Sequence, residues 1–185
     1  MTFSRIYETA DVRRLPIDPV EIARALGVKV VGYKAAAEHF DVDIRELYLR
    51  CPLGFCFTEG GDCCIALNEN ACGEQRRRFT AAHELAHCVL GHPDAETFSK
   101  RQERDAERFA AELLAPLVVL RECGVGSAAE IARLCGISRQ AAELGLARLA
   151  ERERLGFCAS ADELRTAELF REFADSYSSR RRLEA

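Results

Sequence analysis

The chain has 185 residues, with 26 Lys or Arg against 30 Asp or Glu, for a formal net charge of −4. This length suits one moderate domain with a smaller unit, and the acidic balance gives no support to a nucleic-acid-binding class. No apolar run is long enough to span a bilayer, and the first residues lack the apolar core of a secretion signal. We therefore expect a cytoplasmic globular protein without a membrane segment.

Nine cysteines are many for this length, and their number is odd. Without a secretion signal, cysteines are expected as reduced thiols or metal ligands before disulfides. Five of them lie between residues 51 and 72, but no two form a Cys-x-x-Cys pair. We expect small buried side chains there, with a second metal site or a redox sensor as the alternative. Cys88 points about 100° away from His87 around a helix, so we expect it in the core.

The first part of the chain predicts a helix, a strand and a hairpin. Residues 18–27 begin with Asp-Pro, have Glu three positions after the Asp, and end at a glycine, which is typical of a short helix. Residues 28–31 read as a strand. Residues 54–57 and 63–67 flank the turn-rich segment Glu-Gly-Gly-Asp, so they predict a β-hairpin.

Residues 78–91 form the helix that organises the chain, because they contain His-Glu-x-x-His. His83 and His87 are four residues apart, so an α-helix directs both imidazoles to one point, as in zinc proteases. Glu84 lies one step round the helix, where a carboxylate can take a proton from a metal-bound water. The alternative is a core helix with two hydrogen-bonded histidines and a surface glutamate.

Two histidines leave a catalytic zinc site one protein ligand short. His92 would complete a His-x-x-Gly-x-x-His pattern, but here the glycine directly precedes it and the spacing is out of register. The other source is a glutamate on a second helix, predicted over residues 101–115 and ended by a proline. Glu103 and Glu107 lie one turn apart on it, so one can bind the metal while the other hydrogen-bonds the far nitrogen of a ligand histidine. We assign the metal to Glu103 and the hydrogen bond to Glu107, with an exposed charged face as the alternative for both.

Together the two motifs resemble the ImmA/IrrE family of bacterial zinc metallopeptidases. Residues 78–87 are similar to the family pattern R-F-T-x-A-H-E-x-x-H, and residues 103–116 are similar to E-x-x-A-N-x-F-A-A-x-L-L-M-P. The resemblance covers about residues 1–155 and implies that Glu103 is the third zinc ligand. The chain departs from the pattern at Glu107, where the family often has Asn or Asp, and at Ala115, where it has Met.

Residues 127–150 have the outline of a helix-turn-helix. Ser127 begins one helix with a capping-box pattern, Gly136 supplies a turn, and Ser138 begins a second helix to about Ala150. The second helix holds two arginines and one glutamate, a net charge of +1, which is weak for a helix that reads DNA. We therefore do not expect direct DNA binding and favour packing on the protease core or recognition of a partner.

These elements predict an α+β fold with a zincin-like metallopeptidase domain. A small, mainly antiparallel sheet should pack against the His-Glu-x-x-His helix and the glutamate-bearing helix, followed by a helical unit. We place the metallopeptidase domain at residues 1–120, the helix-turn-helix-like region at 121–176 and a disordered tail at 177–185. The last helix should begin at Ser160 with a capping box.

In this interpretation His83, His87 and Glu103 hold Zn²⁺, with Mn²⁺ or Fe²⁺ left open, and Glu84 is the catalytic base. The resemblance implies an endopeptidase that cleaves a helix-turn-helix transcriptional repressor and so relieves repression in a mobile element or a stress response. One alternative is a metal-stabilised anti-repressor that binds without turnover, and another is a DNA-binding regulator acting through residues 127–150. The group that stabilises the oxyanion is not identified; the candidates are Tyr33, Tyr48, His39 and Arg76.

Overall fold

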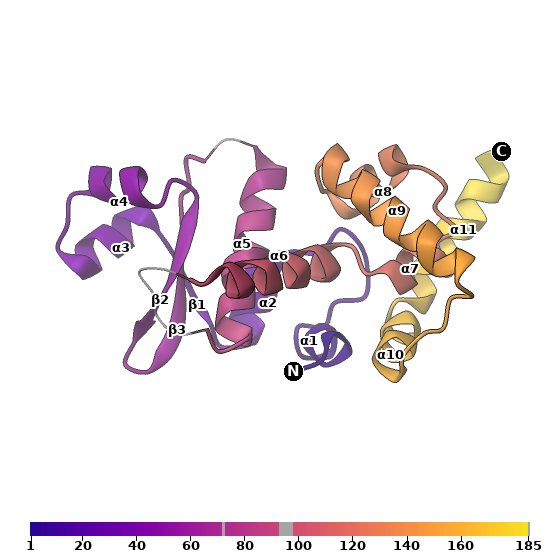
Figure 1. Cartoon of the computed structure of the whole chain (residues 1–185), viewed down its shortest axis with the longest axis horizontal. Helices are drawn as coiled ribbons and strands as arrows, with labels where there is room; N and C mark the ends of the chain where they lie inside the picture. Colours follow the sequence, from indigo (N-terminus) through magenta and orange to yellow (C-terminus); the bar gives the residue numbers. More distant parts are fainter. Residues whose placement is uncertain (72, 93–97, 185) are drawn as a thin grey trace. The chain divides into compact units, whose positions relative to one another are not determined.

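The structure is a computed structural model that describes residues 1–71, 73–92 and 98–184. The chain forms two compact units, Asp18–Ala110 and the combination of Met1–Ile17 with Ala111–Ala185 (Figure 1). This division differs from the predicted boundaries, since the first 17 residues belong with the C-terminal helices. None of the helices in the described ranges is long and apolar enough to cross a bilayer.

A three-stranded sheet lies at the centre of the unit Asp18–Ala110, in the order β1-β3-β2. β2 (Gly54–Glu59) and β3 (Asp62–Leu67) form the predicted antiparallel hairpin through Gly60 and Gly61, whose φ angles of 65° and 95° suit glycine. β1 (Lys29–Gly32) pairs with β3 in parallel. The predicted α+β class is confirmed, with a mixed sheet of six antiparallel and four parallel residue pairs.

The two faces of this sheet carry different helices (Figure 1). On one face, α3 (Tyr33–Phe40) and α4 (Ile44–Arg50) enclose an apolar cluster that includes Phe57 of β2 and Cys64 of β3. Side chains alternate along a strand, so the neighbouring side chains of β2 and β3 point to the opposite face. There α5 (Glu74–Val89) contacts both strands.

α5 is the predicted metal helix, and apolar packing holds it in place. Ala82, Leu85 and Ala86 are fully buried, and α2 (Pro19–Ala25), which begins as predicted with the Asp18 carboxylate accepting from the Val20 N–H, packs beside it. α6 (Lys100–Leu114) is the second predicted helix of the motif. Its buried residues recur every three or four positions, namely Ala106, Phe109, Ala110, Leu113 and Leu114.

The other unit is helical and includes the N-terminus. α1 (Phe3–Thr9) is joined to α10 (Ala161–Leu169) because the backbone N–H groups of Phe3 and Ser4 donate to the Asp162 carboxylate, at 3.1 and 3.0 Å. The buried Tyr7 hydroxyl also donates to the Leu113 carbonyl, at 2.9 Å. These contacts between residues more than 100 positions apart explain why the N-terminal helix does not belong to the sheet-containing unit.

The predicted helix-turn-helix outline is present in this unit as α8 (Ala128–Cys135) and α9 (Arg139–Arg154). Gly136 makes the turn with a φ of 64°, and the Ser127 and Ser138 hydroxyls cap the two helices. α7 (Leu117–Glu122) precedes them with four buried apolar side chains.

The end of the chain is helical where a disordered tail was predicted. α11 (Arg171–Glu184) follows α10 after a break at Phe170, which is fully buried. The Tyr177 hydroxyl donates to Glu130 at 2.8 Å, and the Ser178 hydroxyl donates to the Glu122 carbonyl at 3.1 Å. These hydrogen bonds to distant residues hold a segment whose own composition is polar.

Candidate metal centre

Three side chains predicted as metal ligands meet at one point. His83 Nε2 lies 3.2 Å from His87 Nε2 and 3.3 Å from a carboxylate oxygen of Glu103, and His87 Nε2 lies 3.9 Å from the other oxygen. α5 supplies the histidines and α6 supplies the glutamate. One ligand atom from each residue lies within 4.8 Å of the other two, which makes the group able to hold a metal ion.

The spacing of these atoms fits a small tetrahedral ion. Around zinc, with bonds of about 2.0–2.1 Å, neighbouring ligand atoms lie roughly 3.3–3.4 Å apart. Two of the three observed separations are close to this value, and Glu103 is partly exposed and free to shorten the third. Two imidazoles and one carboxylate are also the ligand set of a catalytic site that keeps its fourth position for water.

Glu84 lies beside this group and is held by the sheet. The residue is only 7 % exposed, and Cys56 of β2 donates hydrogen bonds to its carboxylate from the backbone N–H and from the thiol. Burial, with a contribution from the nearby charge of Glu103, raises the pKa of Glu84 from its ordinary value of 4.5 to about 7. A carboxylate whose pKa is near neutrality is suited to accept and return a proton. Sequence reasoning did not identify Cys56, because no local pattern links a strand residue to this glutamate.

The predicted hydrogen bond from Glu107 to a ligand histidine is not present. Glu107 is exposed, and the Nδ1 atom of His83 is buried without a hydrogen-bond partner in the described part of the chain. The Nδ1 atom of His87 lies 2.8 Å from Nδ1 of His92 instead. The group of possible metal ligands found among the described residues does not include His92, which instead contacts the other nitrogen of His87.

Burial also keeps His87 neutral. Its side chain is fully buried and stacks on Phe98, with ring centroids 3.8 Å apart. Burial, together with the neighbouring His83 and His92, lowers the pKa of His87 to about 4. Neutral imidazole is the form that binds a metal, so His87 keeps this form well below the pH at which an ordinary histidine is protonated.

One cysteine expectation is corrected. Cys63 at the start of β3 and Cys88 near the end of α5 form a disulfide, where reduced thiols were predicted. Cys63 is on the sheet face that carries α5, because its neighbour Cys64 packs on the other face. The disulfide therefore ties the sheet to α5 next to His87. Six other cysteines of the described residues are outside any disulfide: Cys51, Cys56, Cys64, Cys123, Cys135 and Cys158. Cys72 lies outside the described residues.

The four candidates for stabilising the oxyanion lie in different surroundings. The Tyr33 hydroxyl donates to the Cys51 carbonyl, and burial followed by the charges of Cys51 and Glu84 raises its pKa. The Tyr48 hydroxyl accepts from Asn70, His39 pairs with Glu59, and Arg76 is exposed. Of the four candidates, Tyr33 is the one linked to the metal centre by charge, because the carboxylate of Glu84 contributes to its raised pKa.

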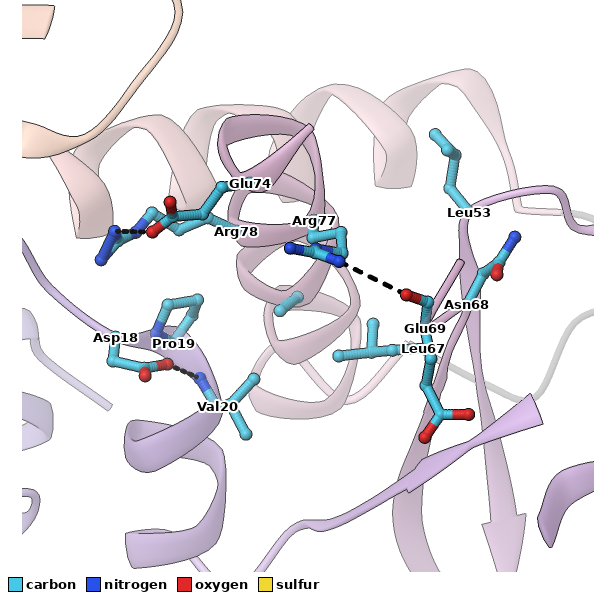
Figure 2. A pocket seen from close by; sticks show the side chains of 11 residues that line it. Asp18, Pro19, Val20, Leu53, Leu67, Asn68, Glu69, Glu74, Arg77 and Arg78 are labelled. Carbon is cyan, nitrogen blue, oxygen red and sulfur yellow. Dashed lines mark hydrogen bonds and ion pairs between the residues drawn. The ribbon is translucent and has the colours of Figure 1, made fainter. Parts of the chain in front are cut away.

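A hollow of about 380 Å³ lies on a different side of α5 from the metal-binding group (Figure 2). It is bounded by the starts of α2 and α5 and the end of β3, and none of the metal-binding group lines it. Figure 2 shows Arg78 paired with the Glu74 carboxylate and Arg77 donating to the main-chain carbonyl of Glu69. Its lining residue Ala81 is two positions from His83, about 200° around the helix, so the hollow is separate from the metal centre.

Comparison with known proteins agrees with this geometry. No curated protein matches the chain significantly. Residues 37–147 match the model of a peptidase family, M78, described as the IrrE N-terminal-like domain. The matched segment holds the whole metal-binding group and Glu84, and it covers 111 of the 185 residues (147 − 37 + 1). The chain therefore belongs to the M78 peptidase family with an IrrE N-terminal-like domain.

Proposed function

We propose that this protein is a zinc-dependent endopeptidase that cleaves a helix-turn-helix transcriptional repressor. Membership of the M78 family supports a metallopeptidase function. The observation that carries the proposal is the meeting of two imidazole nitrogens and one carboxylate next to Glu84, which is buried and has a pKa of about 7. Ligands alone would serve a structural metal, whereas a buried carboxylate beside them supplies the base that hydrolysis needs.

Each residue of the metal centre has a separate role in the proposed hydrolysis. His83, His87 and Glu103 would hold the ion, which when bound lowers the pKa of water to about 7 and polarises a carbonyl. Glu84 would accept the proton of the attacking water and later return it to the amine that leaves. The N–H and thiol of Cys56 would keep the Glu84 carboxylate directed to this position, because both donate to it.

In the described part of the chain β2 pairs with β3 alone, so its other edge could take a substrate peptide as an added strand. β2 is the outer strand of the order β1-β3-β2, and its Cys56 contacts Glu84. A peptide added along this edge would be bound through main-chain hydrogen bonds, which demand little of its sequence. Its scissile bond would then pass near the base.

The helical unit favours a protein partner over DNA. Each of the four arginines of α9 is already paired with a carboxylate, in the pairs Arg139–Glu143, Arg148–Glu112, Arg152–Glu163 and Arg154–Glu151. DNA phosphates would have to compete with these pairs, which disfavours a DNA-reading role for residues 127–150.

Cleavage can be tested by incubating the protein with candidate helix-turn-helix repressors, beginning with any that is encoded next to it. The wild type with zinc should cut one of them at one site, whereas Glu84→Gln should bind zinc and that repressor but cleave at least about 100-fold more slowly. Glu107→Gln, an exposed glutamate on α6, is the matched control and should cleave normally. If Glu84→Gln relieves repression in cells as well as the wild type does, binding alone suffices and the protein is an anti-repressor rather than a protease.

A further inference from the structure

The end of α5 places His92 against a metal-binding histidine. The N–H of His92 donates to the His87 carbonyl at 3.1 Å, and the N–H of Gly91 donates to the Cys88 carbonyl at 3.2 Å. With Gly91 at a φ of 64°, these two bonds form the Schellman motif that ends many helices. The backbone therefore returns His92 to the last turn, where its Nδ1 lies 2.8 Å from Nδ1 of His87.

Two imidazole nitrogens at this distance share one hydrogen atom, so one donates and the other accepts. His87 directs Nε2 to His83 and Glu103, and that atom must carry a lone pair to bind a metal. The hydrogen of neutral His87 must then be on Nδ1, where His92 Nδ1 accepts it. In the opposite arrangement the His87 hydrogen would be on Nε2 and would occupy the metal-binding direction.

Among the residues that the structure describes, His92 is the hydrogen-bond partner recorded for the His87 Nδ1 atom. Its side chain is fully buried, and Phe98 stacks on the face of its ring with an angle of 17° between the planes. A buried N–H without an acceptor is costly, so losing His92 would favour the tautomer that cannot bind a metal. The other ligand histidine differs, because the buried Nδ1 atom of His83 has no hydrogen-bond partner among the described residues.

We propose that His92 is a positioning residue of the metal centre, which accepts the Nδ1 hydrogen of His87 and so selects the tautomer that binds the metal. The inference rests on the proposed metal site and is independent of the substrate. Hydrogen-bond partners of metal-binding histidines typically contribute 10- to 100-fold to metal affinity. Here the partner is His92, which follows the C-terminal end of α5 and lies five positions after His87 in the sequence (92 − 87).

The test compares zinc affinities by chelator competition in the wild type, His92→Leu and His92→Asn. His92→Leu removes the acceptor and should weaken zinc binding about 10- to 100-fold. Asn carries a carbonyl oxygen close to the position of a histidine Nδ1, so His92→Asn should recover most of the affinity. His39→Leu is the matched control, because that histidine pairs with Glu59 and should leave zinc affinity unchanged.

Unfolding of the metal-free proteins separates positioning from stability. Equal unfolding midpoints for wild type and His92→Leu, with weaker zinc binding, support the positioning role. If both His92 variants bind zinc as tightly as the wild type, or both bind it equally weakly, the hydrogen-bonding role is overturned while the metal site stands. A wild type that binds no zinc would overturn the metal site itself and the proposed function with it.

Discussion

Replacing Glu84 by Gln should stabilise the metal-free protein at pH 8. The folded-state pKa of Glu84 is about 7, above its ordinary value of 4.5, so the native state holds the proton more tightly than the unfolded chain. The stability from this group is fully present below pH 4.5 and is lost as the pH rises through 7. The rise from 4.5 to about 7 corresponds to about 3 kcal/mol, and glutamine stays neutral throughout.

Urea unfolding in the presence of a chelator measures this directly. The free energies of unfolding of wild type and Glu84→Gln should be nearly equal at pH 4 and differ by about 3 kcal/mol at pH 8, with the variant more stable. The titration of His87 does not contribute to the difference in unfolding free energy, because both proteins contain this histidine. Glu107→Gln, at an exposed position, should show no such pH dependence relative to wild type. A Glu84→Gln protein that is no more stable than wild type at pH 8 would refute the argument that burial raises this pKa.

Two further predictions concern stability away from the base. The Cys63–Cys88 disulfide joins residues 25 positions apart, so replacing both cysteines by Ala should lower the free energy of unfolding by about 3 kcal/mol under non-reducing conditions. Urea unfolding should show the same loss when wild type is treated with a dithiol, and equal stability in all three samples would contradict it. Tyr7→Phe removes a buried hydroxyl that donates to a main-chain carbonyl and should cost about 1 kcal/mol in thermal unfolding, where no change would show that the bond contributes nothing.

Local patterns predicted much of this molecule. The spacing of His83 and His87 fixes their common helix face, and the turn at Gly60 and Gly61 fixes the register of the hairpin. The Ser160 cap was also readable, since its hydroxyl accepts from the Glu163 N–H within a capping box. Each of these features depends on residues only a few positions apart, which is the range over which a sequence pattern is reliable.

Features that depend on distant residues were not predicted. The Cys63–Cys88 disulfide requires knowing which face of β3 meets α5, and this follows only from the strand register. The contact of Phe3 with Asp162 spans 159 positions and reassigns the N-terminal helix. The position of His92 had a readable signal, because a glycine directly after a helix predicts the Schellman turn that brings the next residue back.

The metal content of the purified protein tests the central claim most directly. Elemental analysis should find about one zinc per wild-type chain, because one group of three ligands is present among the described residues. Glu103→Gln should lose most of this zinc, whereas Asp105→Asn, an exposed neighbour on the same helix, should keep it. Full zinc content in Glu103→Gln, or zinc lost from Asp105→Asn instead, would contradict a metal centre made of His83, His87 and Glu103.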